Sequence, residues 1–357
     1  MIDIDTNDLR DILDRAAGNP TLTLYLPVDP SDPENFREPG TRPWELQLRN
    51  DLDELADALP GEDRAARIRF DEIRSRVQDW LLDYLPAGRT LVLVADEDDV
   101  TSVELPVVLD QVAGYGAPLV AEFARALSEY RLYAAVLVDG TSARLVTGSL
   151  GFISDVAALT FDNRWGMDSA GRSGHNFRFE NRQDEYQQRH QRTIAEQVDR
   201  LVLEFPEFDR LVLGGNEVEA HGVARALGQR ATKALVGIIS APMDSSDADL
   251  TERLRPLAAQ VERDAELAVV AELQAAAGAG RAVFGADQVY RALTQGVAQQ
   301  VVISSHITDR DQVEQIVAAS LAAGAEISFV HEEAANELDP VDGVAARLYY
   351  AAVLPNG

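Results

Sequence analysis

The sequence predicts an α/β fold organised as three domains. Runs rich in Val, Leu and Ile alternate with stretches of helical periodicity, which is typical of layered α/β structure. The chain has 357 residues, more than a single hydrophobic core usually serves, so several domains are expected. We place them at residues 1–128, 129–277 and 278–357.

The composition excludes several classes of protein. Hydrophobic residues make up 46% and charged residues 26% of the chain, the balance of a folded soluble protein. No apolar run approaches the roughly 18 residues that a membrane span needs. The first residues lack a basic and apolar leader, so we expect a cytoplasmic protein. The chain has no cysteine, which excludes disulfides, zinc–thiolate sites and cysteine nucleophiles.

The chain is strongly acidic. It has 60 Asp and Glu against 32 Lys and Arg, a net charge of −28, and Lys233 as its one lysine. A high-salt habitat or a GC-rich genome would explain this composition without a functional cause. The field of the whole molecule opposes polyanions, so we expect no DNA partner, and contact with RNA requires a local basic patch.

The N-terminal region has the pattern of a small α/β domain. After an amphipathic opening, residues 21–27 form a strand pattern that prolines end, so a loop is expected over 28–43. Helical periodicity predicts helices at 44–59 and 64–85. A strand pair at 90–95 and 100–107 completes the region.

The middle region opens with two buried strands, at 132–138 and 143–146. Asp139-Gly140 lies between them and favours a hairpin, because both turn positions of such a hairpin need positive φ. Asp139 could instead be a metal-binding nuclease carboxylate at the end of a first strand, as in ribonuclease H folds. The turn accounts for Asp139 fully, and no second carboxylate can be placed beside it.

Residues 162–176 interrupt this pattern. They hold three Gly, two Ser and two Asn and show no periodicity, which predicts a mobile, exposed loop of the kind that is usually functional or disordered. A long helix is expected directly after the loop, over 179–205. Its second half carries an apolar stripe that should dock on the sheet, formed by Ile194, Val198, Leu201 and Phe205.

The loop and the first half of this helix form a basic region. Six Arg face four acidic residues between 164 and 192. At about 100° per residue, the helical arginines fall within roughly 80° of one another. A solvated face with intrahelical ion pairs and a phosphate-contacting surface are both compatible with this stripe. Its arginines are Arg178, Arg182, Arg189 and Arg192, and Arg164 and Arg172 extend it into the loop.

Further elements alternate in the same way to the end of the chain. In the middle region we expect a strand at 211–213 followed by Gly214-Gly215, a helix from His221, a strand at 236–239, and a long helix over 249–276 interrupted by Pro256. In the third region we expect helices at 287–293 and 310–323 and strands at 301–304, 326–330 and 345–352.

From about residue 129 to 350 the sequence resembles the archaeo-eukaryotic peptide-chain release factor superfamily, in particular its bacterial members, which include Balon-type ribosome hibernation factors. The motifs in chain order are Val138-Asp139-Gly140, the loop and Arg-rich helix, Arg210-Leu211-Val212-Leu213-Gly214-Gly215, Phe284-Gly285, Ala292-Leu293-Thr294-Gln295-Gly296-Val297, Val301-Val302-Ile303, Gly324-Ala325-Glu326-Ile327 and Gly343-Val344-Ala345-Ala346-Arg347-Leu348-Tyr349. The resemblance implies a ribonuclease-H-like middle domain and a small C-terminal domain like the kink-turn-binding ribosomal proteins.

The catalytic loop departs from the family. Where the family has Gly-Arg-Gly-Gly-Gln, this chain has Gly171-Arg172-Ser173-Gly174-His175, so His175 stands in the position of the catalytic Gln if the loops align without a gap. Imidazole can act as a general base near neutral pH, but it lacks the paired donor and acceptor of an amide. His175 is therefore the candidate catalytic residue. The candidate RNA-binding residues are Arg164, Arg172, Ser173, Gly174, Asn176, Arg178, Arg182, Arg189 and Arg192.

The N-terminal domain also departs from the eukaryotic factors. Their stop-codon reading uses Asn-Ile-Lys-Ser and Tyr-x-Cys, and neither motif is present, so we do not expect decoding. Residues 20–33 resemble the distinct N-terminal domain of the bacterial members instead. The remaining histidines lack metal-ligand spacing and no phosphate-binding Gly-x-x-x-x-Gly-Lys occurs, so no metal and no cofactor is expected.

Three functions are compatible with these observations. The favoured one is a non-catalytic ribosome-binding factor that enters the A site, extends the loop towards the peptidyl-transferase centre and preserves idle ribosomes. The second is a peptidyl-tRNA hydrolase that acts on stalled ribosomes through residues 171–176. The third is a ribonuclease-H-type nuclease dependent on Asp139. The ribosome is the expected partner, and elongation factor Tu is a protein partner that the resemblance leaves open.

Overall fold

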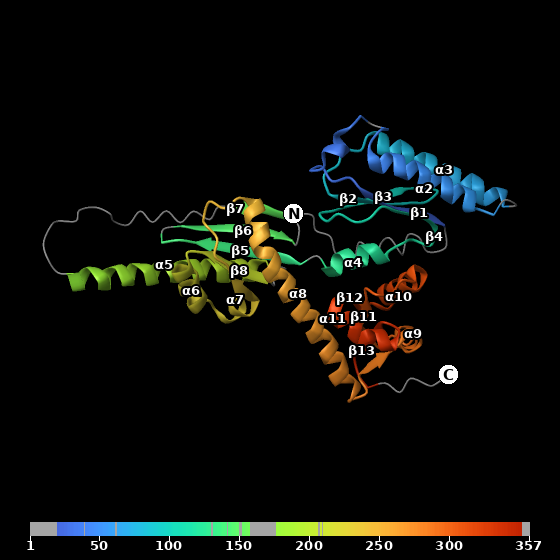
Figure 1. Ribbon diagram of the computed structural model, residues 1–357. Coiled ribbons are helices and arrows are strands. Elements are labelled where there is room, and N and C mark those ends of the chain that lie inside the picture. The colour runs from blue at the N-terminus through green and yellow to red at the C-terminus, as the bar shows by residue number, and fades with distance from the viewer. Residues whose placement is uncertain are drawn as a thin grey trace. The chain divides into compact units, whose positions relative to one another are not determined.

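A computed structural model describes residues 20–38, 40–60, 63–129, 131–140, 142–149, 152–157, 176–205, 208 and 210–351 (Figure 1). The fold is mixed α/β, as expected from the sequence. The chain divides into two compact units, which we describe separately. Unit 1 combines residues 1–129 with 265–357, and unit 2 spans 130–264.

The first sheet of unit 1 is antiparallel, with strand order β3-β2-β1-β4. Helices α2 and α3 cover one face and enclose a core with Leu22, Leu24 and Leu26. Two elements were not predicted from the sequence: strand β4, and a short 3-10 helix, η1, which lies within the loop expected over 28–43. The elements are β1 (Thr21–Pro27), η1 (Pro33–Phe36), α2 (Pro43–Ala58), α3 (Arg64–Leu82), β2 (Thr90–Ala95), β3 (Val100–Leu105) and β4 (Val112–Gly116).

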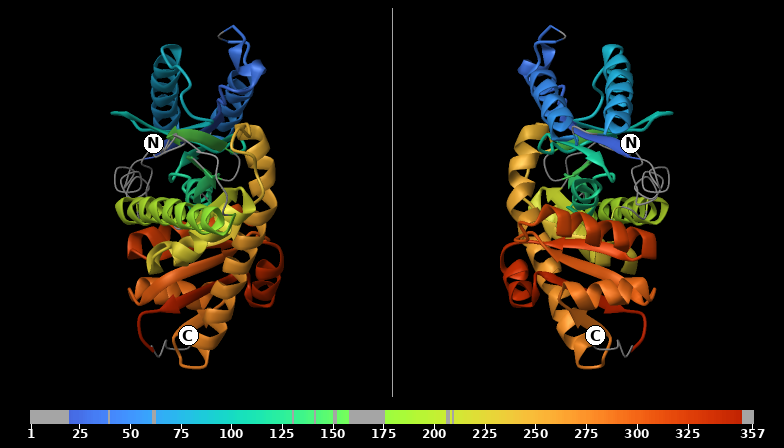
Figure 2. Two further views of the ribbon diagram at one scale, coloured as in Figure 1. Left: turned by 90° about the vertical axis from the view of Figure 1, so that its left-hand side faces the viewer. Right: turned by 90° about the vertical axis from the view of Figure 1, so that its right-hand side faces the viewer.

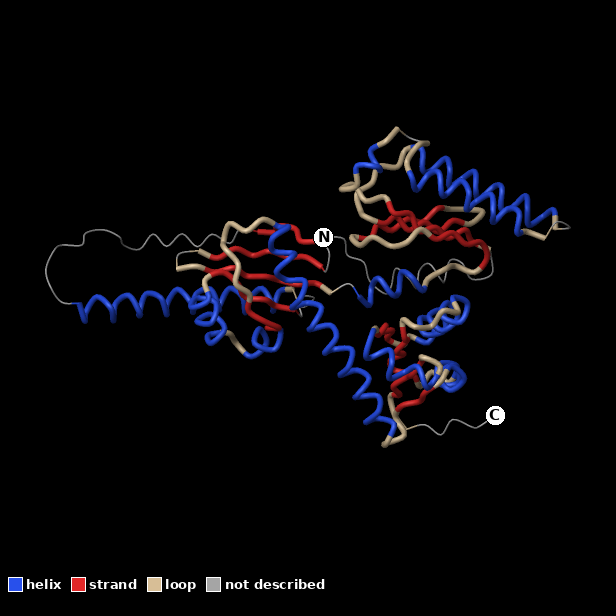
Figure 3. Tube along the Cα trace, viewed as in Figure 1, coloured by secondary structure: helices blue, strands red, loops and turns tan. Residues whose placement is uncertain are grey.

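The second sheet of unit 1 has the order β10-β13-β11-β12 and carries helices on both faces (Figure 3). Helices α9 and α10 pack on one face, and α11 with the end of α8 packs on the other. The sequence missed β10 and α11. The elements are β10 (Ala282–Phe284), α9 (Ala286–Thr294), β11 (Ala298–Ser304), α10 (Arg310–Ala323), β12 (Glu326–Val330), α11 (Glu332–Leu338), η2 (Asp339–Val341) and β13 (Val344–Leu348).

Helix α4 (Ala121–Glu129) joins these two sheets into one unit. Phe123 is fully buried in a core that includes Tyr25 of β1 and Ile316 of α10. The Tyr25 hydroxyl donates to the Leu119 carbonyl at 2.7 Å. Glu314 of α10 accepts hydrogen bonds from two backbone N–H groups at the start of α4, at 2.8 and 3.0 Å. The first and third regions of the chain therefore share a hydrophobic core.

His331 links three segments at one edge of unit 1. Its Nε2 lies 3.0 Å from Glu129 at the end of α4, and its Nδ1 lies 3.1 Å from Glu266 of α8. Its backbone N–H also donates to Glu266, at 2.7 Å. Hydrogen bonds to Glu129 and then Glu266 raise the pKa of His331 to about 9, so the imidazolium form is held at neutral pH.

Unit 2 is built on a mixed sheet of order β7-β6-β5-β8-β9, in which β5, β8 and β9 run parallel and β6 and β7 antiparallel. Helices α5, α6 and α7 pack on one face and α8 on the other. The elements are β5 (Leu132–Val138), β6 (Ala143–Ser149), β7 (Phe152–Ala157), α5 (Asn176–Glu204), β8 (Arg210–Gly215), α6 (Glu217–Ala226), α7 (Gln229–Ala234), β9 (Leu235–Ile238) and α8 (Asp247–Ala277).

Two expectations for unit 2 need correction. The hairpin forms, but its loop spans residues 139–142, because Val138 pairs with Ala143. Gly140 does not adopt a left-handed φ there, so the two-residue turn geometry was wrong. Helix α8 also continues through Pro256. Proline removes one backbone hydrogen bond, and the buried side chains Leu254 and Ala258 hold the helix against the sheet on either side of it.

None of the helices in the described part of the chain has the length and apolar character that a membrane span requires.

Candidate functional site

The candidate site is built on α5, which begins at Asn176, three residues before the helix start that the sequence predicts at 179. Asn176 is the first residue of the helix, and the positions of Arg178 and Arg182 follow in its first two turns. Arg189 and Arg192 have exposed side chains further along the same helix. The predicted loop residues Arg164, Arg172, Ser173, Gly174 and His175 lie outside the described residues.

The second half of α5 docks on the sheet through the predicted apolar stripe. Ile194 and Val198 are 1% and 3% exposed and pack in the core of unit 2, and Leu201 packs against it. Phe205 follows the helix and is 38% exposed, so this member of the stripe was wrong, and Val202 takes its place in the core. One side of α5 is thereby committed to the sheet.

The opposite side of α5 carries the arginines. Positions 178, 182, 189 and 192 lie within roughly 80° on the helix, as the sequence predicts. Arg200, which sequence analysis overlooked, is exposed and falls at the same helical angle as position 182. Glu185 and Glu196 are also exposed on this side, each four residues from one of the arginines.

Two of these arginines, Arg189 and Arg192, have side chains in the described part of the chain, and neither is neutralised there. Neither Arg189 nor Arg192 forms an ion pair there, although Glu185 and Glu196 stand at i,i+4 spacing. An ion pair at this spacing contributes about 0.2–0.5 kcal/mol, so replacing a glutamate by another anion as the partner of either arginine costs little free energy. In a chain of net charge −28, these two unpaired guanidinium groups on one helix face form a surface that suits phosphate oxygens.

Polar side chains anchor the middle of α5 on its inner side. His190 is 9% exposed, and its Nε2 lies 3.2 Å from the Asp139 carbonyl oxygen. Because a carbonyl oxygen only accepts hydrogen bonds, Nε2 is the protonated nitrogen that donates. Gln187 and Gln191 each donate an amide N–H to Glu219 of α6, at 2.6 and 3.0 Å. The histidine that the sequence placed on the basic helix therefore faces inward.

Asp139 acts in the turn after β5. Its Oδ1 accepts hydrogen bonds from the backbone N–H of Ser142 at 2.6 Å and from the Ser142 hydroxyl at 3.1 Å. Its backbone N–H donates to the Ser142 carbonyl at 3.0 Å. These contacts support the turn interpretation of Asp139. No three His, Asp or Glu side chains in the described part of the chain gather into a group that could hold a metal ion.

Gly214 and Gly215 serve strand packing at the same end of the sheet. Gly215 has φ +96°, and a Cβ there would lie 2.1 Å from the Val138 carbonyl oxygen. A Cβ on Gly214 would lie 2.6 Å from the Leu137 side chain. Because neither glycine has a side chain, β8 can pack closely against its neighbours. This close packing explains Gly214-Gly215 without a role in nucleotide binding.

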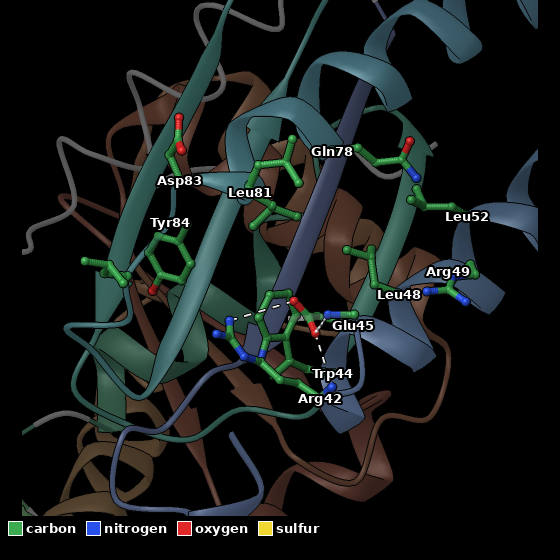
Figure 4. Close-up of a pocket in the computed structure, with 13 residues that line it drawn as sticks. Arg42, Trp44, Glu45, Leu48, Arg49, Leu52, Gln78, Leu81, Asp83 and Tyr84 are labelled. Atoms are coloured by element: carbon green, nitrogen blue, oxygen red, sulfur yellow. Dashed lines mark hydrogen bonds and ion pairs between the residues drawn. The ribbon is translucent and has the colours of Figure 1, made fainter. Parts of the chain in front are cut away.

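Unit 1 contains a separate cavity of about 650 Å³ between the first half of α2 and the end of α3 (Figure 4). The two helices diverge towards this end (Figure 2). Leu48 and Leu52 line one side and Leu81 another, with Arg42 and Trp44 at one end. The Trp44 indole N–H is buried and has no hydrogen-bond partner in the described part of the chain. This cavity suits an apolar group that carries a hydrogen-bond acceptor.

Comparison with known proteins matches nearly all of unit 2, together with helix α4 of unit 1, to a family model. Residues 118–263 match the model for the bacterial archaeo-eukaryotic release factor family 10. This region contains β5, the predicted loop, α5 and the glycines after β8, and it leaves out the cavity in unit 1. No curated protein matches the chain.

Solved structures of low similarity align with much of the chain. An archaeal translation termination factor, aRF1, is 18% identical over 97% of this chain and 99% of its own, with a TM-score of 0.28. Dom34 of S. cerevisiae is 13% identical over 75% of each chain, with a TM-score of 0.43. Ribosome-bound archaeal Pelota is 14% identical over 75% of this chain and 74% of its own, with a TM-score of 0.45. The family match, rather than these values, confirms the resemblance to the bacterial archaeo-eukaryotic release factors, and it does so over residues 118–263.

Proposed function

We propose that this chain, which is release-factor-like over residues 118–263, is a cytoplasmic ribosome-binding translation factor. The observation that carries the proposal is the arginine face of α5, formed by positions 178, 182, 189 and 192 and called the Arg face below. Its described members Arg189 and Arg192 are exposed and form no ion pair among the described residues of a strongly acidic protein. Ribosomal RNA supplies the phosphates that this face suits. The proposal treats unit 2 as the ribonuclease-H-like middle domain that the resemblance implies, with a C-terminal domain like the kink-turn-binding proteins.

In this proposal the protein occupies the A site and acts without catalysis. The Arg face lies on ribosomal RNA, and residues 162–176 reach towards the peptidyl-transferase centre. The chain lacks the Gln that the release factors use, which favours a blocking role that protects idle ribosomes. Elongation factor Tu is the protein partner that this proposal leaves open.

The alternative is a peptidyl-tRNA hydrolase for stalled ribosomes, favoured by the presence of an imidazole at His175. A release assay on vacant and stalled ribosomes, with pelleting of the same samples, separates the two functions. Binding without release supports the protective factor. Release that disappears in His175→Ala establishes the hydrolase.

Charge reversal tests the RNA-binding face. Replacing Arg178, Arg182 and Arg189 together by Glu should abolish co-sedimentation with ribosomes, because each change turns an attraction to phosphate into a repulsion. The matched control replaces three exposed arginines outside this face by Glu and so changes the net charge by the same amount; they are Arg67, Arg225 and Arg230. Unchanged pelleting of the first variant, or equal loss in both, contradicts the placement of α5 on ribosomal RNA.

A further inference from the structure

A buried polar cluster connects the middle of α5 to the rest of unit 2. Glu219 is 6% exposed, and its two carboxylate oxygens each accept an amide N–H, from Gln187 at 2.6 Å and from Gln191 at 3.0 Å. Gln191 is itself 8% exposed. One turn of α5 is thus held by two directional hydrogen bonds to one carboxylate on α6.

Two further features tighten this contact. On α6, a Cβ at Gly222 would lie 2.1 Å from the Gln191 side chain, so only glycine lets the amide lie against the helix. On α5, the preceding residue His190 donates a hydrogen bond from Nε2 to the Asp139 carbonyl oxygen at 3.2 Å. The cluster therefore ties α5 to both α6 and the hairpin after β5.

Burial of the Glu219 carboxylate costs free energy that a purely apolar contact between α5 and α6 would avoid. A buried carboxylate loses its hydration, and Glu219 has no cation partner among the described residues. Apolar side chains of similar size would bury the same surface without that cost. Such side chains, however, would tolerate rotation of α5 about its axis, whereas paired hydrogen bonds have fixed directions.

We propose that Glu219 is a positioning residue, which sets the rotation and direction of α5 and so determines how the Arg face is presented. Because His190 and Gln191 face inward, Arg189 and Arg192 on the same turn face solvent. The residues from 176 to 186 extend α5 by roughly 16 Å beyond the cluster, past the edge of the sheet (Figure 1). A tilt of the helix axis by 10° at the cluster would move the far end by roughly 3 Å on that geometry. The inference deepens the proposed function and rests on it for the role of the arginines.

The first test measures the direction of α5 without ribosomes. The chain has no cysteine, so Asn181→Cys and Lys233→Cys provide one pair of spin-label sites, on α5 and α7. We expect a narrow distance distribution in this background, and a shifted or broadened one after Glu219→Ala. Glu217→Ala removes an exposed carboxylate from the same helix and should leave the distribution unchanged. Identical distributions for Glu219→Ala and its parent overturn the inference, whatever the protein does on ribosomes.

The second test measures ribosome binding by the full chain as a function of salt. Glu219→Ala should weaken binding at least tenfold and lower the dependence of log K on log salt, because a misdirected Arg face contacts fewer phosphates. Glu219→Gln retains an acceptor and should recover part of both. If Glu219→Ala only lowers the fraction of active protein and leaves the salt dependence intact, the residue has a merely structural role and the inference is wrong. If the wild type does not bind ribosomes, the proposed function fails, and the label distances alone decide the positioning role.

Discussion

Removing the imidazolium of His331 should destabilise unit 1 in a pH-dependent way. In the folded protein Glu129 and Glu266 contact its two ring nitrogens at 3.0 and 3.1 Å. The pKa of His331 is raised from 6.5 to about 9. Because the folded state binds the proton more tightly, the stabilisation is fully present below pH 6.5 and is lost as the pH rises through about 9.

The magnitude follows from the pKa and the exposure. A pKa rise from 6.5 to about 9 corresponds to roughly 3 kcal/mol, at about 1.4 kcal/mol for each tenfold change in proton affinity. The side chain of His331 is 36% exposed, so solvent screens part of this interaction, and we expect about 1–2 kcal/mol. His331→Gln should therefore lower the free energy of unfolding by about 1–2 kcal/mol at pH 6 and by much less near pH 10.

Urea unfolding followed by tryptophan fluorescence measures this difference. The chain has three tryptophans, so a Trp165→Phe background leaves Trp44 and Trp80 as reporters of unit 1. Comparing variants at each pH cancels the titration of all other groups. His221→Gln, an exposed histidine in unit 2, is the control and should show no pH-dependent effect on this signal. An equal loss at pH 6 and pH 10, or no loss at either, would refute the reasoning.

Two further predictions concern backbone groups. Gly215→Ala places a Cβ 2.1 Å from the Val138 carbonyl oxygen at φ +96°, so it should destabilise unit 2 by at least about 2 kcal/mol. Thermal unfolding followed by circular dichroism measures this loss. Gly140→Ala is the control and should change stability little, because nothing lies within 4 Å of a Cβ there. Glu314→Ala leaves two backbone N–H groups at the start of α4 without an acceptor and should cost about 1–3 kcal/mol, measured by urea unfolding of unit 1; an unchanged midpoint would mean that water replaces the carboxylate.

Local patterns were reliable where one physical signal dominated. Apolar runs predicted β2, β5 and β11, because consecutive apolar residues of this length favour a buried strand, and the Thr/Leu alternation bounded by prolines predicted β1. Helix α5 was predicted because its apolar stripe has helical spacing. The short elements β4, β10 and α11 were missed, since a few half-buried residues carry almost no periodic signal.

The sequence by itself determined the α/β alternation, the basic region before and along α5, and the resemblance to release factors that the family match confirms. These properties depend on residue type and spacing along the chain. Only the tertiary structure decided that His190 faces inward, that Glu219 holds α5 through two glutamines, and that Glu129, Glu266 and His331 meet. Such contacts join residues that are 28 to 202 positions apart in the chain, and no local pattern encodes which distant polar groups pair once they lose water.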